Sequence, residues 1–342
     1  MDDIIKRMRK IAIFNSFPFH YEMFGFITNY AHSRDYSCDI FTNMHNNMGW
    51  LEHYSKMFPI VRYFSPPSLI GDGRIADYDL VFVTTDDDKG FDERWMTNDG
   101  DVDRVICVNH VNSIRRSCFK THINIANFNG SQVKDNFMTC YGAIDVEEKM
   151  AQLERHESAN PVVTVVGTLA PQDMIDFNRL SCEGDTETNE QNSMRSPAKI
   201  TINFVSRGFD MSLLEKIDRS RFDVNVFFGL DTTAMFEVLK KTTHLMVTYG
   251  TNREHASTVS GSLPLCFTTL CIPVISRAIN KHFQLENAIE FDVVGDGSTY
   301  PINLFLGKRE QEQCLTSLFA ERDRIISKFA KFCDARIQLK RL

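Results

Sequence analysis

Short apolar runs alternate with helical patterns from residue 10 onward. In the first half these runs lie at residues 10–15, 38–42, 60–64, 80–84, 105–109, 122–126 and 137–141. Most are apolar throughout, which is typical of strands buried on both faces of a parallel sheet. After the first run, Met23, Phe26, Ile27, Tyr30 and Ala31 recur at helical spacing. The pattern predicts a βα array and a doubly wound parallel sheet.

The pattern restarts at Pro161, after the charged segment 147–160. Further strands are expected at residues 162–166, 200–206, 223–228, 244–248, 273–276 and 290–294. Residues 181–197 are polar and predict a surface loop. From Leu315, apolar residues at 318, 319, 325, 326, 329, 332 and 333 predict a long amphipathic helix.

This organisation predicts the α/β fold class, with two Rossmann-like doubly wound sheets facing each other across a cleft. The expected parts are an N-terminal domain at 1–148, a linker at 149–160, a C-terminal domain at 161–310, and a helix at 311–342 packing back on the first domain. The 342 residues and 43% hydrophobic content are enough for two cores.

Net charge limits the partners that are expected, and cysteine content indicates the cellular compartment. The net charge of −7 gives no basic field for nucleic acid or an anionic membrane. The nine cysteines are scattered without C-x-x-C spacing, so they are expected to be buried thiols in a reducing compartment. Residues 1–10 are charged, and no apolar run reaches the ~18 residues of a membrane span. A cytoplasmic protein without integral membrane contact is expected, with peripheral membrane contact left open.

The strongest local signal is Ser260-Gly261-Ser262 at the start of an apolar helix that contains Pro264. Such a turn offers unpaired backbone N–H groups and the positive end of a helix dipole to a phosphate. Proline is tolerated in a first turn. An ordinary serine-capped helix is the alternative.

Other loops of the second half follow strands and could approach a nucleotide sugar. Gly167-Thr168 and Arg207 each follow a strand, and Tyr249 opens the loop that carries Glu254. Ligands of α/β sheets bind at the carboxyl ends of strands, so these residues are candidates for contacts with a nucleotide, a diphosphate or a sugar. Solvated loop residues are the alternative.

In the first half, His20 and Glu22 follow the first strand. His110 and Arg115 follow the strand at 105–109 and could hold an acceptor or a phosphate, with solvated arginines as the alternative. Histidine suits proton abstraction near neutral pH, although His20 and Glu22 could simply cap a helix. The cluster Asp86-Asp87-Asp88 could hold a divalent cation, with a solvated turn as the favoured alternative.

The arrangement resembles the GT-B fold glycosyltransferases in its twin halves, its early His20, its strand ending at Gly167, and its Ser260-Gly261-Ser262 helix start. The stretches 78–84 and 105–110 are also similar to glycosyltransferases encoded by large DNA viruses. The resemblance implies a donor site for a UDP- or GDP-sugar in the second half and a glycan acceptor site in the first. The family's pair of glutamates seven residues apart is absent, because Gly261 stands seven residues after Glu254.

The implied activity is transfer of a sugar to a glycan or protein-linked acceptor, without a metal or other cofactor. Arg207 and the helix start would stabilise the leaving diphosphate, and His20 would deprotonate the acceptor in an inverting reaction. Three alternatives remain: a nucleotide-sugar epimerase, a metal-dependent transferase that uses Asp86–Asp88, and a non-catalytic binding protein.

Overall fold

A computed structural model describes residues 9–17, 21–43, 48–71, 74–85, 88–110, 114, 116–125, 133, 135–137, 149, 151, 160–167, 176–182, 199–208, 211–247, 262–292, 301–304 and 308–339. The chain divides into two compact units. The first comprises Met1–Gly142, Ser257–Val259 and Asp323–Leu342, and the second comprises Ala143–Ala256 and Ser260–Arg322.

The first unit contains a six-stranded parallel sheet in the order β3-β2-β1-β4-β5-β6. Its strands are β1 (Lys10–Asn15), β2 (Ser37–Thr42), β3 (Val61–Phe64), β4 (Leu80–Val83), β5 (Val105–Asn109) and β6 (Thr121–Asn124). Its helices include α1 (Phe24–Ser33), α2 (Trp50–Met57) and α3 (Asp99–Arg104). Every residue of β4 and β5 is buried, which explains why their sequences are apolar except for Asn109 at the end of β5.

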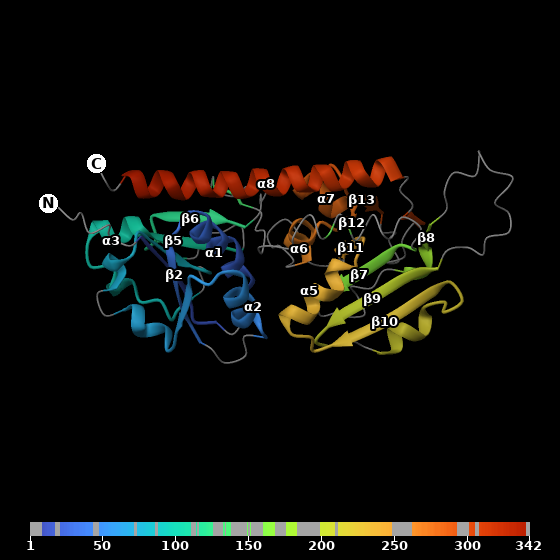
Figure 1. Cartoon of the computed structure of the whole chain (residues 1–342), viewed down its shortest axis with the longest axis horizontal. Coiled ribbons are helices and arrows are strands. Elements are labelled where there is room, and N and C mark those ends of the chain that lie inside the picture. The colour runs from blue at the N-terminus through green and yellow to red at the C-terminus, as the bar shows by residue number, and fades with distance from the viewer. Residues whose placement is uncertain are drawn as a thin grey trace. The chain divides into compact units, whose positions relative to one another are not determined.

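The second unit repeats this topology in the order β10-β9-β7-β11-β12-β13, and Figure 1 labels each of these strands. Its strands are β7 (Val162–Val166), β9 (Ile200–Ser206), β10 (Phe222–Phe228), β11 (His244–Val247), β12 (Ile272–Ser276) and β13 (Ile289–Phe291). Its helices include α5 (Thr232–Lys240), α6 (Ser262–Thr269) and α7 (Arg277–Phe283). In chain order, both sheets have their strands arranged 3-2-1-4-5-6, the order of dinucleotide-binding domains. The α/β fold class with two doubly wound parallel sheets is thus confirmed.

The long C-terminal helix is α8 (Lys308–Leu339), and its residues from Asp323 onward belong to the first unit. Phe329 packs edge-on against Phe26 of α1, with ring centroids 4.6 Å apart, and lies 5.3 Å from Phe137. The hydroxyl of Tyr30 donates to Asp334 at 2.8 Å. The apolar stripe predicted from residue 315 therefore contributes to the core of the first unit.

Several sequence predictions differ from the structure in detail. The strand expected at 122–126 is β6, which begins at Thr121 and ends at Asn124. Phe137, expected to begin a strand at 137–141, lies outside the strands, although Asn136 before it forms an isolated bridge with Asn124. Residues 138–141 lie outside the described part. The two-residue strands β8 (Leu180–Ser181) and β14 (Ile302–Asn303) pair in parallel and were not predicted, because two residues carry no periodicity.

Candidate functional site

A doubly wound sheet binds its ligands at the carboxyl ends of its strands, at the point where the strand order reverses. In the first unit this point lies between β1 and β4, and in the second between β7 and β11. The candidate residues of the sequence analysis stand on loops that follow these strands and their neighbours.

In the first unit, Asp88 joins the loop after β1 to the loop after β4. Its carboxylate accepts a hydrogen bond from the Ser16 amide at 2.7 Å, a short one from the Ser16 hydroxyl, and one from the Gly90 amide at 3.0 Å. The side chain is fully buried, and this burial raises the pKa of Asp88, while the donors from Ser16 and Gly90 oppose the shift. The sequence identified Asp88 only as a possible metal ligand.

The loop after β5 joins the same cluster through His110 and Arg116. The His110 Nε2 lies 2.6 Å from the Thr84 carbonyl oxygen, which can only accept, so Nε2 carries a proton. The Arg116 guanidinium donates to the carbonyls of Asp88 at 2.8 Å and Phe91 at 3.0 Å. Arg116 therefore organises backbone.

The other acceptor-side candidates are only partly described. His20 and Arg115 lie outside the described residues. Glu22 lies in the 3-10 turn Tyr21–Met23, and its side chain lies outside the described part. The roles of these residues stay predictions.

The acidic cluster is also only partly described, since Asp86 and Asp87 fall outside the described residues. In the part of the chain that the structure describes, no group of three or more His, Cys, Asp or Glu side chains is placed to hold a metal ion. Asp88 itself uses both carboxylate oxygens on Ser16 and Gly90.

In the second unit, backbone hydrogen bonds connect the loops after β7, β9 and β10. The Gly167 amide donates to Val205 at 3.0 Å, and the Gly229 amide donates to Ser206 at 3.1 Å. Gly167 has a φ of +129°, a value that favours glycine, and among described atoms a Cβ there would meet nothing within 4 Å. As far as the chain is described, the space in front of Gly167 is therefore open.

Arg207 is an exposed cation at this edge of the sheet. The Ser206 hydroxyl donates to the Gly208 carbonyl at 2.6 Å, which fixes the backbone on either side of Arg207. The Arg207 side chain is exposed and has no hydrogen-bond or ion-pair partner among the described residues. Its charge is available to an anion.

The predicted phosphate seat lies at the start of α6, on the chain segment that follows switch-point strand β11. Ser262 is the first residue of α6 and is 5% exposed, and Pro264 lies in the first turn as expected. Thr168, Tyr249, Glu254, Ser260 and Gly261 lie outside the described residues. The structure thus gives the helix start but not the loop before it.

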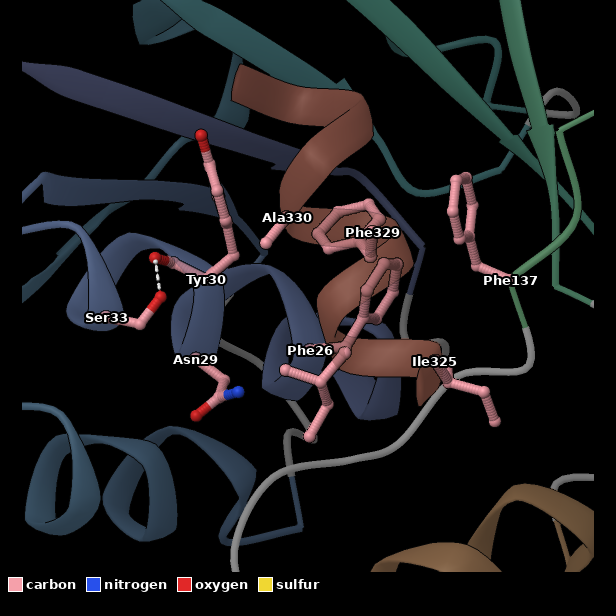
Figure 2. A pocket seen from close by; sticks show the side chains of 9 residues that line it. Phe26, Asn29, Tyr30, Ser33, Phe137, Ile325, Phe329 and Ala330 are labelled. Carbon is pink, nitrogen blue, oxygen red and sulfur yellow. Dashed lines mark hydrogen bonds between the residues drawn. The ribbon is translucent and has the colours of Figure 1, made fainter. Parts of the chain in front are cut away.

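The cavities found among the described residues are less suited to bind a sugar or a nucleotide than the carboxyl edges of the two sheets. A pocket inside the first unit lies between α1 and α8, and Figure 2 shows Phe26, Tyr30 and Phe329 lining it. Its volume is about 20 Å³, room for about one water molecule. This apolar gap is too small for a sugar or a nucleotide.

A larger depression lies beside α7 in the second unit, with a volume of about 910 Å³. The Arg277 Nε in it lies 3.3 Å from Glu290 and 3.5 Å from Asp292. Lys281 also lines the depression, but Glu286, Glu290 and Asp292 give it more carboxylates than cations, so this surface does not favour a phosphate.

The interior of the second unit holds two basic side chains that the sequence pattern did not predict to be buried. The Lys149 Nζ donates to the carbonyls of Leu239 at 3.1 Å, Lys240 at 2.8 Å and Thr242 at 2.5 Å. Lys149 is fully buried, although it lies in a charged segment. Burial, with a smaller contribution from the Lys149 charge, lowers the pKa of His244 to about 4.

The eight described cysteines are free thiols, and burial raises the pKa of Cys266 and Cys333. None of the described helices has the length and apolar character of a membrane span.

Comparison with known proteins gives no matching family model and no matching curated protein. Solved structures do match along nearly the whole chain. HepE of Anabaena in complex with UDP-glucose has 12% identity and a TM-score of 0.42, with 96% of this chain and 95% of that chain covered. An alpha-glucosyltransferase in complex with UDP and a 13-mer DNA has 10% identity and a TM-score of 0.46, with 95% and 94% covered. The N-terminal domain of Candida albicans trehalose-6-phosphate phosphatase has 8% identity and a TM-score of 0.45, with 96% and 98% covered. The likeness is one of overall arrangement.

Proposed function

We propose that this protein is a glycosyltransferase that moves a sugar from a nucleoside diphosphate sugar to a glycan or protein-linked acceptor without a metal ion. The observation that carries the proposal is the repeated 3-2-1-4-5-6 strand order. Each repeat provides a switch point, and candidate residues stand on the loops around both. Two ligand-binding edges in one chain suit a reaction with two substrates.

The donor is assigned to the second unit. The exposed Gly167 backbone allows close approach of a sugar or a diphosphate, and the charge of Arg207, which has no partner among the described residues, attracts phosphate. The start of α6 adds helix-dipole stabilisation of the leaving diphosphate. Contacts from Thr168, Tyr249, Glu254, Ser260, Gly261 and Ser262 are part of the proposal.

The acceptor is assigned to the first unit. His20 follows β1 and is proposed as the base that removes the acceptor hydroxyl proton, if the anomeric configuration is inverted. In a retaining reaction His20 would only position the acceptor. Glu22, His110 and Arg115 are proposed to bind the acceptor.

A ligand-binding measurement tests the donor site. The melting temperature of the purified protein is measured with UDP, GDP, ADP, CMP and their common sugar conjugates, each with EDTA or with Mn²⁺. A ligand that binds only folded protein raises the melting temperature by mass action. The expected result is a rise with one nucleotide family in EDTA, lost in Arg207→Ala.

Arg219→Ala is the matched control. Arg219 precedes β10 and so lies near the amino ends of the parallel strands, whereas Arg207 follows the carboxyl end of β9. The control variant should bind nucleotide like the wild type. A response that needs Mn²⁺ and is lost in Asp86→Asn would replace the metal-free proposal, and no response to any nucleotide would overturn the donor site.

A further inference from the structure

Three neighbouring loops of the first unit meet at Asp88, whose carboxylate is buried. Asp88 lies in the loop after β4, contacts Ser16 of the loop after β1, and receives Arg116 of the loop after β5 on its backbone carbonyl. β1, β4 and β5 are adjacent, and β1 and β4 flank the switch point. Asp88 is therefore at the centre of the edge where a ligand of this sheet would bind.

The contacts around Asp88 leave little room for adjustment. The carboxylate is fully buried and accepts three hydrogen bonds, two of them from Ser16. Gly90 is packed so closely that an added Cβ would lie 2.7 Å from the Ser16 Cβ and 3.1 Å from Asp88 Oδ1. The cost of burying a carboxylate is thus offset by donors that all belong to the loops themselves.

The position of Ser16 gives this contact a consequence for the reaction. Ser16 directly follows β1, and His20 stands four residues further along the chain. The same loop after β4 provides the Thr84 carbonyl that receives the His110 ring. The loop after β4 thereby contacts both the loop after β1, which carries His20, and His110 at the start of the loop after β5.

We propose that Asp88 is a positioning residue for the acceptor: it holds the loop after β1 against the loop after β4, without touching either substrate. This inference rests on the proposed glycosyl transfer. It implies that loss of the Asp88 contact weakens use of the acceptor and leaves binding of the donor nucleotide unchanged, because the donor is assigned to the other unit.

The test compares the wild type with Asp88→Asn, Gly90→Ala and Ser16→Ala. In Asp88→Asn an amide nitrogen replaces one acceptor oxygen, so at least one donor of Ser16 or Gly90 loses its partner. Gly90→Ala forces the loops apart without changing a charge. Ser16→Ala removes one of three bonds and gives a milder variant if Asp88→Asn does not fold. Asp103→Asn is the control, since this carboxylate on α3 is exposed and faces Lys120.

Two readouts are made on the full chain. Amide hydrogen exchange measures protection of Ser16, which should fall in Asp88→Asn and Gly90→Ala but not in Asp103→Asn. Transfer is measured from UDP-glucose and GDP-mannose to a panel of p-nitrophenyl glycosides. We expect kcat/KM for the acceptor to fall about 10- to 100-fold, the effect of a misplacement of about 1 Å, with nucleotide Kd unchanged.

The readouts separate this inference from the proposed function. If the wild type transfers sugar and Asp88→Asn has the acceptor kinetics of Asp103→Asn, the positioning role is wrong while the transferase stands. If the wild type transfers nothing but Ser16 loses protection in Asp88→Asn, the transferase proposal fails and the contact is structural only. Equal amide exchange of Ser16 in Asp88→Asn and Asp103→Asn would show that Asp88 does not hold Ser16 in place.

Discussion

Replacement of Lys149 by methionine is expected to destabilise the second unit. The lysine ammonium donates to the carbonyls of Leu239 and Lys240 in the last turn of α5, and to that of Thr242 just after the helix. Methionine keeps the apolar stem and loses all three donors. The carbonyls also form the negative end of the α5 dipole, so the lost interaction is charge-assisted.

The magnitude follows from two opposing effects. A hydrogen bond to a charged group contributes about 1.5–3 kcal/mol, and three such bonds are lost. Removal of the buried ammonium relieves a desolvation cost of several kcal/mol. We expect a net loss of about 3 kcal/mol in the free energy of unfolding of this unit. At about 2–4 °C per kcal/mol for a domain of 150–250 residues, its melting temperature should fall by about 6–12 °C.

Native-state amide exchange is the suitable assay, because it reports the stability of each unit separately. A loss of about 3 kcal/mol makes the most protected amides of β11 and β12 exchange about 100-fold faster. Lys241→Met is the matched control, since Lys241 is exposed and directly follows α5. Equal protection in the two variants would show that the Lys149 hydrogen bonds do not stabilise the unit.

Three further predictions concern stability and binding. His244 has a pKa of about 4 against 6.5 for an ordinary histidine, so its stabilising contribution is present above pH 6.5 and lost as the pH falls toward 4. Acidification should therefore lower the free energy of unfolding by about 3 kcal/mol through this group. In unfolding titrations of His244→Asn, the free energy of unfolding should depend less on pH between 6.5 and 4. Gly167→Ala places a side chain at a φ of +129°, which should lower the free energy of unfolding by about 1–3 kcal/mol and weaken nucleotide binding in a calorimetric titration. Unchanged stability and unchanged binding would contradict the assignment of Gly167 to the donor site. Asp334→Asn breaks a partly exposed ion pair with Arg34 and should cost at most about 1 kcal/mol in urea unfolding, with a smaller difference in 1 M salt.

The hydrophobic pattern predicted the central strands well because β4, β5, β11 and β12 are continuous buried runs. The prediction for 105–109 coincides with β5, and that for 162–166 coincides with β7. The order of strands in the sheets could not be read from the pattern, since it depends on which crossover each helix makes. Phe137 was assigned to a strand because apolar residues follow it, yet its ring packs against Phe329 of α8.

The candidate site was predicted in kind but not in its connections. Gly167 and Arg207 were identified because they follow strands, and the structure adds the φ and the exposure that make them suitable. The contact between Asp88 and Ser16 spans 72 residues and has no signal in a single sequence. The burial of Lys149 also has no signal in the sequence, because a lysine in a charged segment normally faces solvent.

Glycosyl transfer itself is the most direct test of the account. The wild type and His20→Ala are incubated in EDTA with UDP-glucose or GDP-mannose and a panel of p-nitrophenyl glycosides, and products are identified by mass spectrometry. The account predicts a glycosylated acceptor and one nucleoside diphosphate per transfer, with the rate lowered in His20→Ala. Conversion of the donor to an isomeric nucleotide sugar without any acceptor, or absence of product from a protein that binds nucleotide, would contradict it.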